Sequence, residues 1–194
     1  MEILRRYFLG IIVTIFWAGC LSAARADEVN RHFAGVTAIL SQVRQSENLP
    51  DTVHRNPLVL KAAGLFLKEA DSYNLSDGEL HSTFRKLFPH SKWRVWVPQF
   101  EIRKVKKELY FFSLAYAAST QESSLYLFHG SAHLVIDSGN AGLIEIKDVK
   151  SSDSRLEVTY VRTPGSTRPD EMVASLIKKS GKWRVSKRKI THWH

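Results

Sequence analysis

Four residues in the second half of the chain have the chemical types that acid–base catalysis requires. His133 and Asp137 stand four positions apart in strand-like sequence, so they would share one face of a strand. Tyr110 and Tyr116 belong to an aromatic stretch. A base and an acid in an apolar cavity, each with a pKa shifted by burial, can isomerise or dehydrate a substrate without a cofactor. These four residues are therefore candidates for catalysis.

A structural interpretation of the same residues is the stronger one. Asp137 begins the segment Asp-Ser-Gly-Asn, and aspartate is common at turns because its carboxylate bonds to nearby backbone N–H groups. Buried tyrosines most often fill a core. The sequence also lacks the strong motifs of hydrolases, zinc proteases and nucleotide-binding enzymes. We expect no cofactor, and an enzyme is the less favoured class of function.

Two histidine pairs have spacings that could bind a metal ion. His129 and His133 flank a glycine in strand-like sequence, where residues four apart lie about 13 Å from each other, too far for one ion. His192 and His194 could chelate on a strand, but a protein site normally needs further carboxylate or thiolate ligands. We predict no metal site and interpret these histidines as surface residues.

Basic residues are the most distinctive feature of the chain, whose net charge is +9. One cluster comprises Arg103, Lys104, Lys106 and Lys107. A second, without any acid, lies near the C-terminus and is a candidate binding surface: Lys178, Lys179, Lys182, Trp183, Arg184, Lys187, Arg188 and Lys189. Such clusters attract anionic partners. The competing interpretation is a solvated strand face that keeps the protein soluble.

Residues 1–26 have the order of a signal peptide. Arg5 and Arg6 precede an apolar run over residues 7–21, and small residues follow, with an Ala-Arg-Ala cleavage site that ends at Ala26. The alternative is an inner-membrane anchor through residues 7–21, a run shorter than the roughly 20 residues that span the hydrocarbon core. We therefore expect cleavage after Ala26 and a single periplasmic or secreted domain over residues 27–194.

Removal of the signal peptide leaves 25 basic and 18 acidic residues, so the exported domain keeps a net charge of +7. It also removes the only cysteine. The expected partners of an exported basic domain are envelope proteins or anionic envelope polymers and lipids. Its surface could also contact a membrane, whereas nucleic acid is a disfavoured partner.

The hydrophobic periods predict helices first and strands afterwards. Apolar residues at three- and four-residue steps predict helices over 29–47, 56–72 and 76–88. A period of two and branched residues predict strands over 92–97, 125–136, 143–149, 156–161, 172–177 and 183–190, with hairpin turns at 138–142 and 179–182. Residues 100–118 fit a long strand or a helix passing into one. This order predicts an α+β fold with three N-terminal helices packed on a curved antiparallel sheet.

The C-terminal hairpins carry a resemblance to a known family. Leu156 to Tyr160, a loop through Pro164 and Gly165, Met172 to Lys178, and Ser180 to Val185 resemble the last strands of the nuclear transport factor 2-like superfamily. Helices leading into the sheet, behind an export signal, are similar to the TraE-like periplasmic subunits of type IV secretion systems. Those subunits usually keep their N-terminal helix as an anchor, and the cleavage site here departs from that pattern.

The resemblance implies a cone-like sheet that hosts several functions, so the function depends on the site. We expect an exported, non-enzymatic binding or assembly module, such as a component of an envelope secretion machine. One alternative is a small cofactor-free isomerase or dehydratase. Another is a carrier of an apolar ligand in a cavity next to the aromatic block 110–116.

Overall fold

The computed structural model describes residues 31–45, 55–88, 98–116, 122–140, 142–163 and 168–193. The predicted signal peptide and the predicted strand 92–97 lie outside these residues. The helices are α2 (Ala34–Gln45), α3 (Pro57–Ser72) and α4 (Asp77–Leu87). The strands are β1 (Pro98–Lys106), β2 (Leu109–Tyr116), β3 (Glu122–His129), β4 (Ala132–Asn140), β5 (Glu145–Ser151), β6 (Arg155–Arg162), β7 (Asp170–Lys179) and β8 (Lys182–Trp193).

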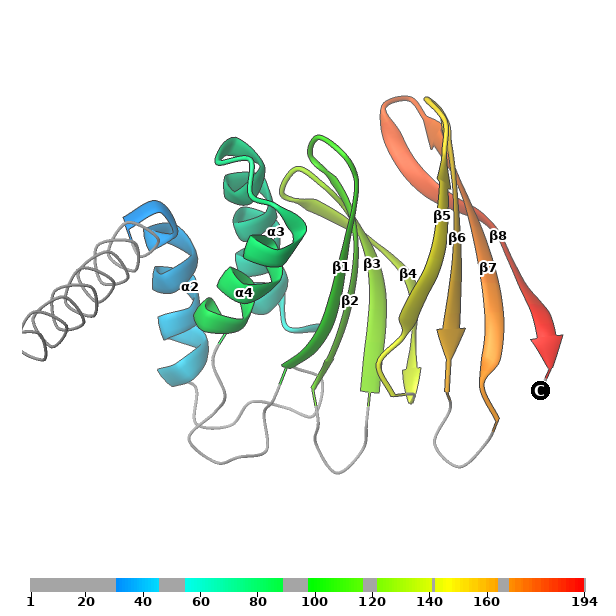
Figure 1. The fold of residues 1–194 in the computed structure, drawn as a ribbon, viewed down its shortest axis with the longest axis horizontal. Coiled ribbons are helices and arrows are strands. Elements are labelled where there is room, and N and C mark those ends of the chain that lie inside the picture. The colour runs from blue at the N-terminus through cyan, green and yellow to red at the C-terminus, as the bar shows by residue number, and fades with distance from the viewer. Residues whose placement is uncertain are drawn as a thin grey trace, which may run out of the picture.

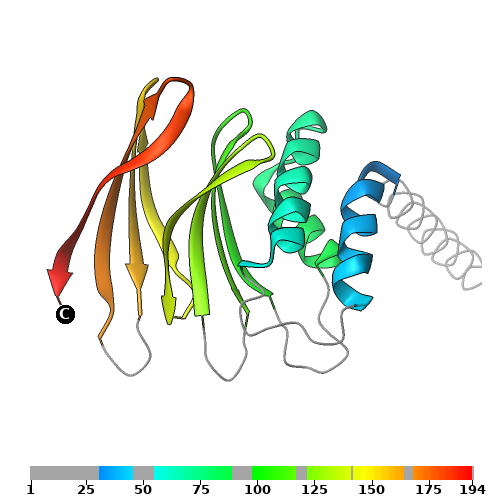
Figure 2. The ribbon, with the colours of Figure 1, turned by 180° about the vertical axis from the view of Figure 1, so that it is seen from behind.

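The elements stack in three layers (Figures 1 and 2). Strands β1 to β4 form an antiparallel sheet, here named the inner sheet, and β5 to β8 form a second one, the outer sheet. Helices α3 and α4 cover one face of the inner sheet, α2 packs against α3, and the outer sheet covers the other face of the inner sheet. The predicted α+β class and the helix-first order are confirmed, and the strands divide into two open sheets. No helix of the described part of the chain combines the length and apolarity needed to cross a membrane.

Local capping chemistry sets the starts of two helices. The side chain of Asn56 accepts a hydrogen bond from the Leu58 N–H, and Pro57 occupies the first turn of α3, where no backbone donor is needed. At α4, Ser76 accepts from the Glu79 N–H while the Glu79 carboxylate accepts from the Ser76 N–H. Both starts lie where the sequence predicts them.

The strand boundaries differ from the prediction at two turns. The single predicted strand 125–136 is wrong, because Gly130, with φ of 58°, and Ser131 turn the chain between β3 and β4. The predicted hairpin turn at 138–142 is also wrong, because this segment ends β4 and leads to the other sheet. The turn at 179–182 is confirmed, and its central residues Ser180 and Gly181 both have the positive φ of a tight hairpin.

The inner sheet is buried on both faces. On the helix side, Phe112 and Phe128 join α3 and α4 in one apolar cluster, the helix-side core. On the other side, Phe111 and Leu127 pack against the outer sheet in a second cluster, the inter-sheet core. Strands buried on both faces lose the alternation of polar and apolar residues. The missing alternation explains why the sequence does not clearly identify residues 109–115 as one strand.

Every edge strand of the two sheets carries a β-bulge, whereas the pairings β2·β3 and β6·β7 are regular. The extra residues are Val105 in β1, Ile136 in β4, Lys147 in β5, and Ser186 and Thr191 in β8. A bulge disrupts the row of free backbone groups that another strand would pair with. The four edges are therefore poor templates for the addition of a further strand.

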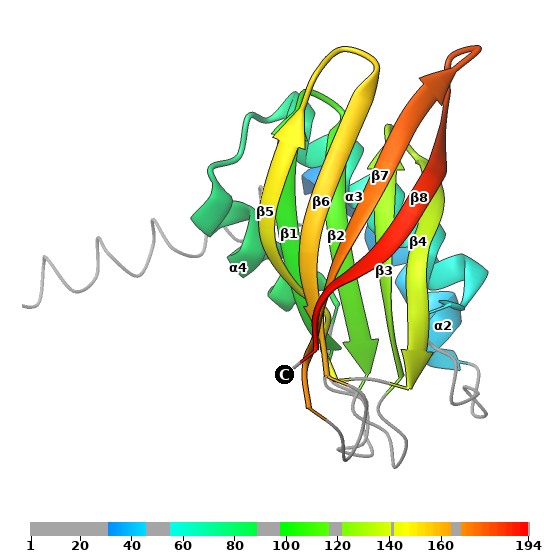
Figure 3. The same cartoon turned by 90° about the vertical axis from the view of Figure 1, so that its right-hand side faces the viewer.

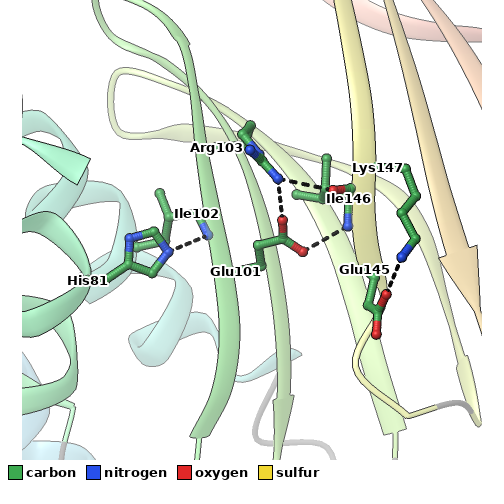
Figure 4. A network of polar contacts seen from close by, with 7 residues as sticks. All are labelled: His81, Glu101, Ile102, Arg103, Glu145, Ile146 and Lys147. Atoms are coloured by element: carbon green, nitrogen blue, oxygen red, sulfur yellow. Dashed lines mark hydrogen bonds and ion pairs between the residues drawn. The ribbon is translucent and has the colours of Figure 1, made fainter. Parts of the chain in front are cut away.

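Polar side chains join the layers along the β1 edge (Figure 4). Glu101 accepts a hydrogen bond from the Ile146 N–H at 2.8 Å, and Arg103 donates to the Ile146 carbonyl at 3.2 Å. The same arginine pairs with Glu101 at 2.9 Å. On the helix side, His81 Nε2 accepts from the Ile102 N–H. Residues of β1 thus fix α4 and β5 on opposite sides of the inner sheet.

Asp71, at the C-terminal end of α3, attaches that helix to the β1–β2 hairpin. Its carboxylate, 3% exposed, pairs with Lys104 and accepts hydrogen bonds from the Tyr110 hydroxyl at 2.7 Å and the Glu108 N–H. Burial alone would raise the pKa of Asp71, but the bonds from Lys104, Tyr110 and Glu108 outweigh it and hold the pKa below its ordinary value. The ionised carboxylate therefore stabilises this junction.

This lowered pKa predicts an acid-sensitive contribution to stability. A carboxylate whose folded pKa is lowered contributes stability above its unfolded pKa, and the contribution is lost as the pH falls through the folded pKa. We expect the difference in unfolding free energy between the wild type and Asp71→Asn to shrink as the pH is lowered below about 4. Urea unfolding from pH 7 to pH 3 measures it, and a difference that stays constant would contradict the assignment.

Candidate anion-binding surface

Asp137 lies between the two sheets with its carboxylate fully engaged. It is 4% exposed and accepts hydrogen bonds from the Tyr160 hydroxyl at 2.8 Å and the Ser138 N–H at 2.9 Å. Arg188 donates to it at 3.3 Å, and the Arg162 guanidinium lies 3.7 Å away. Burial, followed by the Asp137 charge, raises the pKa of Tyr160, so this hydroxyl stays a donor. Through Tyr160, Arg162 and Arg188, Asp137 connects the inner sheet to the outer sheet and forms a clamp between them.

The predicted shared face of His133 and Asp137 is wrong, because the bulge at Ile136 lies between them. The imidazole of His133 lies 5.6 Å from the ring of Phe128, whose side chain belongs to the helix-side core, whereas Asp137 bonds to Tyr160 of the outer sheet. An extra residue in a strand reverses the faces of the residues beyond it. The two candidates therefore point to opposite sides of the inner sheet.

Tyr110 does not line a common site with His133 or Asp137. Tyr110 is buried in the helix-side core, where its hydroxyl donates to Asp71. Burial and the adjacent Asp71 carboxylate raise the pKa of Tyr110. The side chain of Tyr116 lies outside the described residues. Tyr110 thus has the structural role of the Asp71 junction.

The two histidines of the His-Gly-Ser-Ala-His segment lie on different strands. His129 ends β3 opposite Ala132, and His133 lies in β4 opposite Phe128, so the predicted separation along one strand does not apply. Within the described residues, no group of three histidine, cysteine or acidic side chains could hold a metal ion. The side chain of His192 and all of His194 fall outside this part of the chain.

The C-terminal basic cluster lies on β7 and β8, and most of it points away from the inner sheet. Trp183 and Val185 of β8 contact the inter-sheet core, so their neighbours along the strand face outward. The bulge at Ser186 then shifts the alternation by one residue. The exposed, outward-facing cations are Lys179, Lys182, Arg184, Lys187 and Lys189, and they are named here the basic stripe.

Three members of the predicted binding cluster are not part of the basic stripe. Trp183 is 8% exposed in the inter-sheet core, with its indole shielded from solvent. The ammonium of Lys178 lies 5.9 Å from the centre of that indole. Arg188 points inward and donates to the Ile136 carbonyl and to Asp137. Its role is to bridge the two sheets at the edge formed by β4 and β8.

The outer face of the outer sheet is uncovered by the described elements (Figure 3). An open depression of about 560 Å³ lies on this face near the β5–β6 and β7–β8 turns. Its lining includes Lys150, Arg155 and four serines, with Glu157 and Ile177. The hydroxyls and cations of this lining suit a polar, anionic ligand.

Charge is distributed unevenly across this face. On β7 and β8, the basic stripe is accompanied by one described outward acid, Glu171. On β5 and β6, the outward acids Glu145, Asp148 and Glu157 offset the nearby cations, and Glu157 lies 3.8 Å from Lys150. The positive potential is therefore concentrated along the β8 side of the face.

The N-terminal basic cluster is divided between structural and exposed positions. Arg103 and Lys104 are engaged with Glu101 and Asp71, on opposite faces of β1. Lys106 and Lys107 are exposed at the β1–β2 turn. This cluster does not form one surface.

Sequence reasoning missed several charged residues that hold the layers together. Asp71, Glu101 and Arg162 occur singly, without a spacing that indicates a partner, because their partners lie on other elements. One signal was available for Asp71, since an acid in the last turn of a helix faces the negative end of the helix dipole and so needs a cationic or hydrogen-bonding partner. The identity of that partner requires the fold.

The fold and the surface together define an α+β domain with two stacked antiparallel sheets, helices on one side and a basic face on the other. Comparison of the chain with protein-family models, curated proteins and solved structures finds no match.

Proposed function

We propose that this chain is an exported, non-enzymatic binding or assembly module that attaches to an anionic partner through the basic stripe. The observation that supports it best is the concentration of five exposed cations on one uncovered sheet face, Lys179, Lys182, Arg184, Lys187 and Lys189. Surface cations that only maintain solubility have no need to lie in one line. Because residues 1–26 have the order of an export signal, we expect the anionic partner to be a component of the cell envelope.

The residues that an enzyme or a carrier would need have structural partners. Asp137 is bonded to Tyr160 and two arginines, and Tyr110 is bonded to Asp71. The aromatic block next to which a carrier would hold its ligand contributes Phe111 and Phe112 to the two cores. These contacts favour the binding module over both alternatives.

The resemblance to nuclear transport factor 2-like proteins extends this proposal. Helices packed on an antiparallel sheet are compatible with that superfamily, and a basic docking face is compatible with a subunit of an envelope secretion machine. Under this proposal the helices and the inner sheet are the scaffold, and the outer sheet presents the surface.

Neutralising the basic stripe is expected to weaken the interaction strongly without unfolding the protein. The variant Lys182→Gln, Arg184→Gln, Lys187→Gln and Lys189→Gln, named here the stripe variant, removes four exposed charges from β8. We expect it to bind envelope fractions at least roughly tenfold more weakly than the wild type, because four exposed ion pairs are lost. Co-sedimentation with isolated envelopes, as a function of salt concentration, measures the change.

The matched control removes the same number of charges elsewhere. Lys61, Lys68, Lys86 and Lys107 are exposed on the helices and the β1–β2 turn, and their replacement by glutamine also lowers the net charge by four. This control variant should bind like the wild type. Equal weakening in both variants would indicate a response to net charge alone, and a wild type that binds no anionic component would refute the proposed function.

A further inference from the structure

The basic stripe has a regular spacing along β8. Residues that share a strand face are separated by about 6.8 Å, twice the rise per residue. Lys182, Arg184, Lys187 and Lys189 lie opposite Lys179, Ile177, Ser175 and Val173, which are alternate residues of the regular strand β7. Because Ser186 is the extra residue of the bulge, the four cations lie opposite successive outward-facing residues of β7, and each such cross-strand pair is one row of the stripe. The stripe is a line of charges about 20 Å long.

A flat anionic surface does not match this line. A membrane lying on the outer face would press against Glu145, Asp148 and Glu157 on the β5 and β6 side as well as against the cations. Like charges brought together in this way weaken binding. A narrow, linear partner can follow β8 and leave the acidic half of the face in water.

The edge and the composition of the face exclude two other modes of binding. Backbone pairing with β8 is disfavoured because bulges at Ser186 and Thr191 interrupt its free edge. Stacking of nucleic-acid bases needs exposed aromatic rings, and among the described side chains the outer face has none, since Trp183 points into the core. Recognition must therefore proceed through charge on side chains.

We infer that the partner is an extended acidic segment of another protein, with carboxylates at alternate positions, lying lengthwise along β8 over Lys182, Arg184, Lys187 and Lys189. An extended chain directs alternate side chains to the same side at about 6.8 Å intervals, which matches the rows of the stripe. The exposed side chain of Ile177, beside Arg184, offers an apolar contact within the same line. This inference rests on the proposed function and narrows its partner to one class.

Two labelled peptides of identical composition test the spacing. In one, four glutamates alternate with four threonines, and in the other the four glutamates form one block. Only the alternating peptide can present all its carboxylates on one side when extended. We expect fluorescence anisotropy at low salt to give about five- to tenfold tighter binding of the alternating peptide to the purified protein, with affinity falling as salt is added.

The stripe variant should lose this preference, and the control variant at Lys61, Lys68, Lys86 and Lys107 should keep it. A single Lys187→Glu substitution provides a second variant, and thermal unfolding verifies that each variant is folded. Equal affinity for the two peptides would overturn the inference. Tighter binding of phosphatidylglycerol vesicles or of an oligothymidine strand than of the alternating peptide would also overturn it, while leaving the proposed anionic partner intact. Failure to bind any of these anions would overturn both.

Discussion

Asp137→Ala is expected to lower the free energy of unfolding by about 2–4 kcal/mol. The substitution leaves the Tyr160 hydroxyl without its acceptor and removes the counter-charge of Arg162 and Arg188. Removing one partner of a buried ion pair is costly because the other stays uncompensated. The value is set below that of a fully buried pair because the Arg188 side chain is 51% exposed. Urea unfolding followed by tryptophan fluorescence measures the change.

Tyr160→Phe is the matched variant for this clamp. It removes one hydrogen bond and leaves both arginines paired, so it should cost about 1 kcal/mol. If Asp137→Ala changes stability by less than Tyr160→Phe, the carboxylate does not hold the sheets together. In that case its contacts would have to be interpreted as the environment of a functional acid instead.

Gly64→Ala is expected to destabilise the protein by about 1–3 kcal/mol, although alanine is the better helix former. Gly64 lies in α3 where the helix meets the β3–β4 turn. A Cβ at this position would stand 2.8 Å from the Ser131 carbonyl oxygen and 3.2 Å from the Phe128 ring. Backbone cannot yield as a flexible side chain can, so the helix must move away from the inner sheet. Thermal and urea unfolding report the loss.

Gly78→Ala gives the opposite sign and serves as the control. Gly78 is also helical, in α4, but a Cβ there meets no atom within 4 Å. Alanine should stabilise this site by about 0.4–1 kcal/mol through the lower entropy of the unfolded chain. If both glycine-to-alanine changes stabilised the protein, the close approach at Gly64 would not be maintained in solution.

Sequence patterns predicted the features that depend on neighbouring residues. The starts of α3 and α4 follow from Asn56 with Pro57 and from Ser76 with Glu79, and the last hairpin follows from Ser180 and Gly181. Each of these is a short-range hydrogen-bonding or φ preference. The α+β class followed from the change of period along the chain.

Features that depend on distant residues could not be predicted in the same way. The β3–β4 hairpin was hidden because Tyr126 and Leu127 are both buried, one on each face, which removes the alternation that identifies a strand. The strands divide into two sheets because β5 does not pair with β4, the strand that ends at Asn140. No local residue preference encodes that choice.

The sequence predicted which basic residues cluster at the candidate site, but it did not predict which face of the sheet each of them occupies. Strict alternation from Lys182 would send Lys187 and Lys189 into the core and expose Arg188. The bulge at Ser186 reverses this outcome, so that Arg188 reaches Asp137 and the two lysines join the basic stripe. The bulge has no sequence signature here, so the sequence alone predicts one surface for the whole cluster.

Strand order has a consequence for how the chain folds. Each strand pairs with its neighbour in sequence in both sheets, so hairpins form by closing short loops and little chain entropy is lost before the first contacts. The helices and the inner sheet precede the outer sheet in the chain, and none of their strands pairs with a strand of residues 142–193. Until the outer sheet docks, Phe111, Leu125 and Leu127 face water on an open apolar surface. A delay in the docking of the outer sheet would therefore leave the protein most prone to aggregation.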